Sequence, residues 1–366
     1  MFTGTYRRDG EGDYLCSKSQ VLSMLRDQTE DTIDMKVVDY LHLPDLNQET
    51  IRGYRNMHQN ISEGHPFSRL GQDEYLRSIG AAAISEKDGK LHPTTAGLLM
   101  FGNDYDIVRE FPEYFLDYRE QLDPSIRWSD RLWSTAGTWS GNVFDFFLRA
   151  YNKIALGLKI PFHMEGIIRV DDTPIHRAVR EALVNCLSNA DYYGVQGVVI
   201  RRTPTSLVLE NPGNIRTGKR QMIQGGISDP RNKTILKMFN LLDIGERSGS
   251  GVPNIFNVWS DRGWTVPVIE EDSNPSRTRL ILVFDGEQAN KTSEQANKTS
   301  EHKERIFLFL QENGISKTKD IAEAISLSQA RVRVILSEMV NDGIITARGK
   351  TNSRLYSLTN QNQSSK

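Results

Sequence analysis

A glutamate and an asparagine one helical turn apart, Glu181 and Asn185, are the residues of this sequence best suited to chemistry. Around them, apolar residues recur at helical spacing from residue 175 to 186, and Thr173-Pro174 before them fits a helix start. Side chains at positions i and i+4 lie on one face of a helix. That face is only partly opposite the apolar stripe, so we expect it to border a pocket.

Two glycine turns follow this predicted helix. The first, Glu210-Asn211-Pro212-Gly213, ends an antiparallel pair predicted over 195–202 and 206–210. The second, Gly249-Ser250-Gly251, precedes an apolar segment over 252–258, and the backbone N–H groups of such a helix start form an anion site. Taken singly, a Glu/Asn pair also fits a solvated helix face and a Gly-Ser-Gly sequence an ordinary tight turn. Their order along the chain favours a pocket.

This order of elements resembles the Bergerat ATP-binding fold of DNA gyrase, histidine kinases and mismatch-repair ATPases. The resemblance is closest to a divergent, "helicase-like" branch in bacterial transcriptional regulators of the Schlafen/AlbA type, in which Arg-Glu-Ala-Leu-Val-Asn (180–185) and Asn-Pro-Gly (211–213) recur. It implies an α+β fold class, a Bergerat-type α/β sandwich whose mixed sheet is covered by helices.

The same resemblance implies a role for each motif residue, with ATP or ADP and Mg²⁺ as cofactors. Glu181 would be the general base and Asn185 the metal ligand, and Glu210 would stand in the place of the adenine-binding Asp. The full set of implied nucleotide-binding residues is Asn185, Glu210, Asn211, Gly213, Gly249, Ser250, Gly251 and Thr278. Pro212 and Asn214 replace glycines of the first turn, so we expect any hydrolysis to be slow.

A further glycine-containing segment, 213–220, resembles a P-loop but is a false match. Residues 213–220 fit the P-loop pattern except at its last position, where Arg220 replaces the Ser or Thr whose hydroxyl binds Mg²⁺. The segment also follows a predicted hairpin instead of a buried parallel strand. We therefore interpret it as a basic loop, and the sequence lacks the P-loop engine of a translocating helicase.

Composition describes an ordinary globular protein. The chain has 366 residues, 25% of them charged, and a formal net charge of −2, so nucleic-acid binding must be local. Two cysteines, Cys16 and Cys186, give no disulfide framework, and the seven histidines show no metal-ligand spacing. Without a run of ~18 apolar residues or a signal-peptide pattern, we expect a cytoplasmic protein that has no membrane association.

The chain before the predicted pocket divides into two parts. Residues 1–34 resemble the last strand and helix of a Schlafen/AlbA-like domain, most of which would be missing from this chain. Residues 35–162 form a mixed α/β region that packs on the nucleotide-binding domain, 163–285. Within it, Trp128, Trp133 and Trp139 interrupt a polar loop. Stacking on bases is one role for them, and packing over the edge of the core is the interpretation that the sequence favours.

After residue 285 the composition changes. A seven-residue unit, 287–293, is repeated letter for letter at 294–300 and has one apolar residue per unit, so we predict a flexible linker over 286–302. Residues 303–358 read as three helices and a two-stranded wing, which is a winged helix-turn-helix. Residues 359–366 are predicted to be a disordered tail.

The winged helix has the chemistry of a DNA reader. Residues 303–358 contain nine Lys or Arg against six Asp or Glu. We expect the third helix to enter the major groove and the wing to meet phosphates or the minor groove, with a homodimer reading two half-sites in double-stranded DNA. The predicted contact residues are Gln329, Arg331 and Arg333 on the helix and Arg348, Lys350 and Arg354 in or near the wing. A protein-binding winged helix is the alternative.

Together these patterns favour a bacterial DNA-binding transcriptional regulator with a divergent ATP-binding sensor domain. The alternative is an ATP-hydrolysing, helicase-like or DNA-remodelling enzyme. A third interpretation is an interaction scaffold that binds neither ligand.

Overall fold

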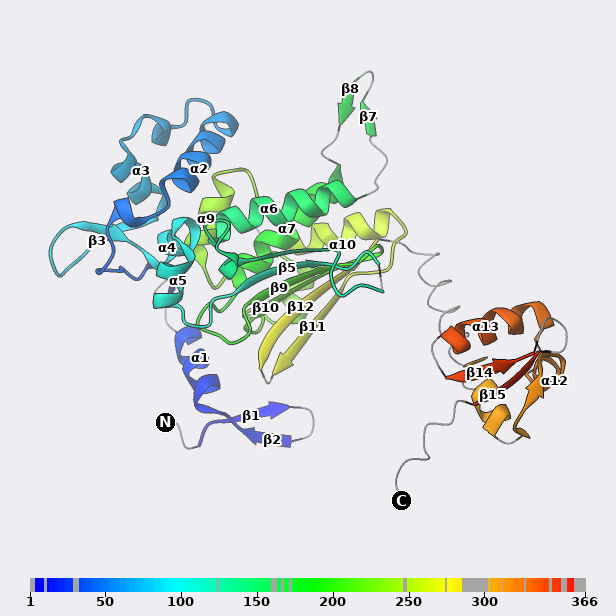
Figure 1. Cartoon of the computed structure of the whole chain (residues 1–366). Helices are drawn as coiled ribbons and strands as arrows, with labels where there is room; N and C mark the ends of the chain where they lie inside the picture. The colour runs from blue at the N-terminus through cyan, green and yellow to red at the C-terminus, as the bar shows by residue number, and fades with distance from the viewer. Residues whose placement is uncertain are drawn as a thin grey trace. The chain divides into compact units, whose positions relative to one another are not determined.

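The structure is a computed structural model that forms two compact units, residues 1–285 and 286–366, each described here by itself (Figure 1). It describes residues 4–9, 12–28, 33–123, 125–158, 163–165, 168–170, 173–245, 249–273, 275–284, 302–303, 305–311, 313–325, 327–341, 344–349 and 354–358. The predicted linker repeat and the predicted tail lie outside these residues.

A six-stranded mixed sheet is the centre of the first unit. Its strand order is β11-β12-β10-β9-β5-β6, antiparallel throughout except for the parallel pair β9 and β5. The strands are β5 (Leu116–Glu120), β6 (Asp130–Trp133), β9 (Val198–Arg202), β10 (Ser206–Pro212), β11 (Val268–Ser273) and β12 (Ser276–Val283). Because β5 and β6 belong to the region before residue 163, one sheet joins that region to the predicted nucleotide-binding domain.

Helices cover one face of this sheet (Figure 1). α7 (Pro174–Asn189) contacts β10, α6 (Val143–Gly157) contacts β5, and α10 (Gly251–Asp261) packs against α7. The apolar stripe predicted for α7 is buried at every position: Ile175, Val179, Ala182, Leu183 and Cys186. Burying one large apolar side chain contributes about 1.5–3 kcal/mol, so this stripe holds α7 against the sheet.

The remaining helices and strands of the first unit are short. The helices are α1 (Lys18–Gln28), α2 (Gln48–Ile61), α3 (Gln72–Ile79), α4 (Thr95–Phe101), α5 (Asp104–Glu110), α8 (Lys219–Gln224) and α9 (Lys233–Asn240), with 3-10 turns at Ile33–Met35, Leu43–Asp45, Pro66–Arg69 and Ser134–Ala136. The paired strands are β1 (Tyr6–Asp9) with β2 (Gly12–Leu15), β3 (Ala82–Ile84) with β4 (Leu91–Pro93), and β7 (His163–Glu165) with β8 (Ile168–Val170).

Two sequence predictions for this unit need correction. A strand is predicted over 111–118, but Phe111 is the C-cap of α5 and the strand begins only at Leu116, because Pro112 follows the helix end and the chain must turn first. Thr173 occupies the N-cap position of α7 without capping it, since its hydroxyl pairs with Nδ1 of His176 at 2.8 Å.

The second unit has the predicted winged-helix arrangement. Helical residues 305–311 precede α12 (Thr318–Ala324) and α13 (Gln329–Asn341). A small sheet of order β13-β15-β14 has its first strand before α12 and its other two strands after α13. Its strands are β13 (Ser316–Lys317), β14 (Ile345–Arg348) and β15 (Leu355–Leu358). The predicted apolar face of α13, Val332, Ile335, Leu336 and Met339, is buried in this unit's own core. The predicted α+β fold class is confirmed for both units.

Candidate functional site

Glu181 and Asn185 lie one turn apart on α7. Glu181 is 7% exposed, and Asn185 is half-buried. Nδ2 of Asn185 donates a hydrogen bond to Oε1 of Glu181 at 3.0 Å. This bond turns the amide so that its carbonyl oxygen is left for another partner, and it presents a carboxylate and an amide oxygen side by side.

Both side chains line a pocket between α7, the sheet and the start of α10. The pocket encloses about 930 Å³ of empty space when the open solvent at its mouth is included. The predicted site residues that line it are Glu181, Asn185, Asn211, Gly249, Gly251 and Thr278. Residues from four separate sequence motifs therefore meet at one cavity.

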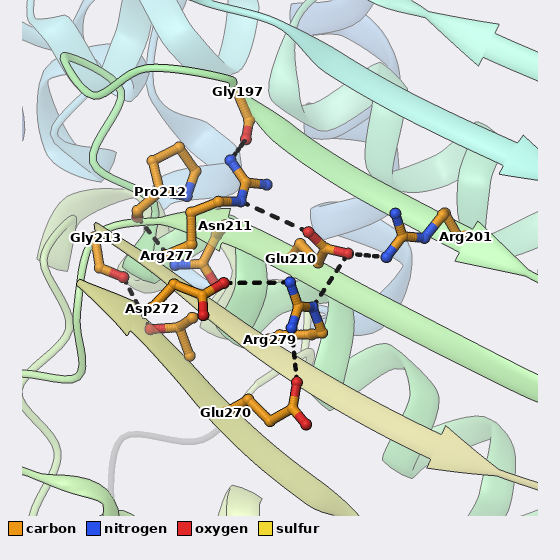
Figure 2. Close-up of polar contacts among 11 residues, drawn as sticks. Gly197, Arg201, Glu210, Asn211, Pro212, Gly213, Glu270, Asp272, Arg277 and Arg279 are labelled. Atoms are coloured by element: carbon orange, nitrogen blue, oxygen red, sulfur yellow. Dashed lines mark hydrogen bonds and ion pairs between the residues drawn. The ribbon is translucent and has the colours of Figure 1, made fainter. Parts of the chain in front are cut away.

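Glu210 does not line this pocket, which corrects its predicted placement. Side chains alternate along a strand, and Leu209 and Asn211 of β10 face the pocket, so Glu210 points to the other face of the sheet (Figure 2). There its carboxylate pairs with Arg201 and lies 3.6 Å from Nε of Arg277 and 3.3 Å from Nε of Arg279. Asn211 and Asn214 are the polar residues of this turn that line the pocket.

The alternation of side chains along β10, which decides that Asn211 and not Glu210 faces the pocket, could be read from the sequence. Leu207 and Leu209 are the buried apolar residues of the strand, so Asn211 continues their face. Nδ2 of Asn211 donates to the carbonyl of Pro212 at 3.1 Å, which orients its amide oxygen as an acceptor. Gly213, with φ +96°, is absent from the described lining; its carbonyl accepts from the hydroxyl of Thr278 at 2.8 Å.

The second glycine turn requires its glycines. Gly249 has φ +73°, and a Cβ there would lie 2.8 Å from the backbone of Ile227. A Cβ on Gly251, the first residue of α10, would lie 1.9 Å from Oε1 of Glu181. The start of an 11-residue helix is thus held in close approach to the Glu181 carboxylate. Ser250 is exposed and is not among the described residues that line the pocket.

Several polar residues of the pocket wall were not predicted. Nε of Arg216 pairs with Asp229 at 2.8 Å, and both residues line the cavity. Arg216 belongs to the basic loop of the false P-loop match, which was the available signal. Arg231 is not among the described residues that line this pocket, and it donates to the carbonyl of Asn189 at 2.7 Å. Cys186 also lines the pocket, and burial raises the pKa of its thiol to about 12, so it stays neutral at physiological pH.

The predicted DNA contacts are only partly described. Gln329 and Arg333 are exposed on α13. Arg354 is exposed, with its guanidinium carbon 5.8 Å from the centre of the Tyr356 ring. Arg331 and Arg348 lie in α13 and β14, but their side chains are outside the described part of the chain, as is Lys350 altogether.

Within the described residues, no group of three or more His, Cys, Asp or Glu side chains is arranged to hold a metal ion. No described helix is both long and apolar enough to cross a membrane.

Three family models match separate segments of the chain. Residues 22–117 match a domain of unknown function (DUF8451), and residues 196–282 match "Putative ATP-dependent DNA helicase recG C-terminal". Residues 299–346 match "Winged helix-turn-helix DNA-binding". The expected architecture, an ATPase-like domain followed by a C-terminal winged helix, is thereby confirmed.

One solved structure extends the similarity to nearly the whole chain. The DIP2311 protein from Corynebacterium diphtheriae aligns over 97% of this chain and 75% of its own, with a TM-score of 0.51 and 14% sequence identity. At this identity the likeness concerns the fold alone. No curated protein matches the sequence.

Proposed function

We propose that this protein is a DNA-binding transcriptional regulator that acts in the cytoplasm and binds ATP or ADP in the pocket between α7 and α10. One observation supports the nucleotide most: four motifs far apart in sequence supply a carboxylate, two amides, a hydroxyl and two glycines to a single cavity. The match of residues 196–282 to an ATPase-like family model supports the same proposal.

The residues present fit a nucleotide with its Mg²⁺ ion. The start of α10, which carries Gly249 and Gly251, is the end of the helix where the dipole favours negative charge, so a phosphate would be held there. The oriented amide oxygen of Asn211 fits an amino group of the base, and the carbonyl oxygen of Asn185 fits Mg²⁺. Bound Mg²⁺ would offset phosphate charge; because it usually takes one or two protein ligands beside phosphates, a cluster of carboxylates is not needed.

Glu181 is the residue placed to accept a proton from water. Its carboxylate lies beside the start of α10, where a terminal phosphate would be held, and Asn185 donates to it. A hydrogen-bonded carboxylate is a weak base, and Pro212 stiffens the turn beside the nucleotide. We therefore propose slow hydrolysis at most.

The winged helix would bind double-stranded DNA, with α13 in the major groove. Arg333 and Gln329 on its exposed face have the side chains that read guanine and adenine edges. The match to a winged helix-turn-helix DNA-binding family model supports this role. An ATP-hydrolysing enzyme that remodels DNA remains the second candidate, favoured by the position of Glu181 alone.

Isothermal titration calorimetry with ATP and Mg²⁺ tests the pocket. The intact protein should bind, and Gly249→Asp should abolish binding, because it adds bulk and a negative charge where backbone approaches phosphate. Glu181→Ala should keep binding and lose whatever hydrolysis is present. Failure of the unmodified protein to bind any adenine nucleotide would reject the proposal, and turnover near the enzyme median of about 10 s⁻¹ would favour the remodelling enzyme.

A further inference from the structure

The face of the sheet opposite the helices carries arginines in register. The helices with the most extensive contacts to the sheet in the described first unit, α6 and α7, lie on the other face (Figure 1). Strand pairing places one open-face residue per strand in a single row from β11 to β6: Val268, Ile281, Val208, Arg201, Arg119 and Arg131. The row is aliphatic over β11, β12 and β10 and cationic over β9, β5 and β6.

Two of the three tryptophans noted in the sequence meet the cationic end of this row. The guanidinium carbons of Arg119, Arg127 and Arg131 lie 4.9, 5.4 and 6.0 Å from the centre of the Trp128 ring. Arg131 also lies 5.0 Å from the ring of Trp133. We call Arg119, Arg127, Arg131, Trp128 and Trp133 the arginine–tryptophan cluster. Trp139 is separate, since its indole N–H donates to the carbonyl of Trp133 and its ring stacks on Phe146 in the core.

The cluster carries more positive charge than its one carboxylate balances. Asp117 lies beneath it, with a side chain that is 0% exposed, and accepts hydrogen bonds from Arg119 at 2.6 Å and from Arg131 at 2.9 Å. The side chains of these two arginines are 25% and 32% exposed, and Arg127 is exposed as well. Each guanidinium has five N–H donors, so Asp117 fixes the orientation of Arg119 and Arg131 without using all their donors.

We propose that the arginine–tryptophan cluster binds single-stranded nucleic acid. Proteins that hold single strands combine cationic groups along the backbone with aromatic and guanidinium planes on which bases stack. The row from Arg201, which also pairs with Glu210, to Arg131 crosses three adjacent strands, about 10 Å at ~4.8 Å per strand. Its exposed guanidiniums would form a short track for phosphates beside the Trp128 indole. A duplex keeps its base faces covered, so the indole selects an unpaired strand.

A folded protein is the competing occupant of such a surface. Arg and Trp are enriched in protein interfaces, but the centre of an interface is depleted in charge. Here three guanidiniums surround the central indole, and they carry an excess of positive charge on a chain whose net charge is −2. This electrostatic pattern favours a polyanion with stacking bases.

Fluorescence anisotropy of the intact protein with a labelled 20-nucleotide oligo-dT tests the proposal. Trp128→Ala should weaken binding tenfold or more, because the stacking platform is lost. Arg127→Ala should weaken it severalfold and make the logarithmic salt slope shallower by about 0.7. Arg127 is exposed on a loop, so its variant keeps the fold even if replacement of the half-buried Trp128 does not.

Two controls separate this site from its alternatives. Arg52→Ala removes the same charge from an exposed position of α2 and should leave oligo-dT affinity within twofold. Arg333→Ala should weaken duplex binding by the winged helix and leave oligo-dT binding unchanged. Absence of oligo-dT binding by the intact protein, or equal losses in Arg127→Ala and Arg52→Ala, would overturn the proposal. Displacement of oligo-dT by poly-glutamate as effectively as by unlabelled oligo-dT would show a polyanion surface without base stacking and would overturn it too.

Discussion

At the scale of single residues, Glu210 and Asn211 show how one position along a strand decides a role. They are neighbours in β10, yet one lies among arginines on the open face of the sheet and the other lines the pocket (Figure 2). The first glycine turn, residues 210–213, and its position after a strand could be read from the sequence. Which of the two polar residues faces inward depends on strand parity, and parity needs the buried leucines of the same strand as a reference.

Separate substitutions of Asn211 and Glu210 should distinguish an effect on ligand binding from an effect on stability. Asn211→Ala should weaken ATP binding about tenfold, the worth of one hydrogen bond to a base in a closed site. Glu210→Gln should keep the affinity within about twofold and lower the free energy of unfolding by about 3 kcal/mol, because the buried guanidinium of Arg277 loses its counter-charge. Calorimetry and urea denaturation measure the two effects. The exposed Glu270→Gln, 46% exposed, is the control and should change stability by no more than about 0.5 kcal/mol. Loss of ATP affinity in the Glu210 variant alone would instead support Glu210 as the adenine-binding residue.

A second residue-scale prediction concerns His92 in the β3–β4 hairpin. Its Nε2 lies 3.0 Å from the Asp88 carboxylate and its Nδ1 lies 2.7 Å from the carbonyl of Leu41, so both ring nitrogens face acceptors. The hydrogen bond to Asp88, then that to Leu41, raises the pKa of His92 above its ordinary value of 6.5. Asp39 acts in the same direction, while the His42 ring, 5.2 Å away, is the nearest other imidazole.

The sign of the pH dependence follows from that raised pKa. The folded state favours the protonated imidazole of His92. Its contribution to the free energy of unfolding is therefore fully present below the pKa that His92 has in the unfolded chain. That contribution is lost as the pH rises through the higher pKa of the folded state. The melting temperature of the unmodified protein should therefore fall further between pH 6 and pH 9 than that of the His92→Asn variant. Thermal unfolding at a series of pH values measures the difference. Parallel curves for the two proteins would mean that His92 is not charged in the folded state.

At the scale of elements, α1 is attached to the turn that forms the pocket. Arg26 and Ser23 of α1 bind the buried carboxylate of Asp191 at 2.8 and 3.2 Å. The backbone N–H of Asp191 donates to the carbonyl of Pro212 at 2.9 Å, the same carbonyl that accepts from Asn211. A ligand that moves Asn211 therefore acts on the residue that holds α1.

This attachment predicts a response of α1 to nucleotide. Binding of ATP should change the hydrogen exchange of the amides over residues 18–28, and Arg26→Ala should remove that response while making the same amides exchange severalfold faster, as expected for a lost, partly buried ion pair. Mass-spectrometric hydrogen exchange reports both quantities. Lys18→Ala, an exposed position on the same helix, should behave like the unmodified protein. An unchanged nucleotide response in Arg26→Ala would show that α1 is only a structural attachment.

Elements with a strong period were predicted well, and elements that depend on distant partners were not. The stripe of α7 and the core face of α13 follow from spacing alone, because a helix buries residues of its own segment. The pairing of β5 with β9 is parallel and joins residues about 80 positions apart, which no local pattern encodes. The three-residue strands β7 and β8 are too short to show alternation.

At the scale of the whole molecule, one chain combines a pocket in its first unit with a winged helix in its second, for which we propose DNA binding. A regulator with a sensor domain needs the two ligands to be coupled. Coupling free energies between sites are typically about 1–3 kcal/mol, which corresponds to a change in affinity of roughly 5- to 150-fold. A remodelling enzyme would instead require turnover, and a scaffold would require neither ligand.

The most direct test is a titration of the intact protein with its own promoter duplex, with and without saturating ATP and Mg²⁺. The account predicts duplex binding that Arg333→Ala weakens and that ATP shifts at least fivefold, with the shift abolished in Gly249→Asp. Duplex affinity that is identical with and without nucleotide, in a protein shown by calorimetry to bind ATP, would contradict the sensor role. Binding that is unchanged after deletion of all residues beyond Ser300 would contradict the winged helix as the reader of DNA.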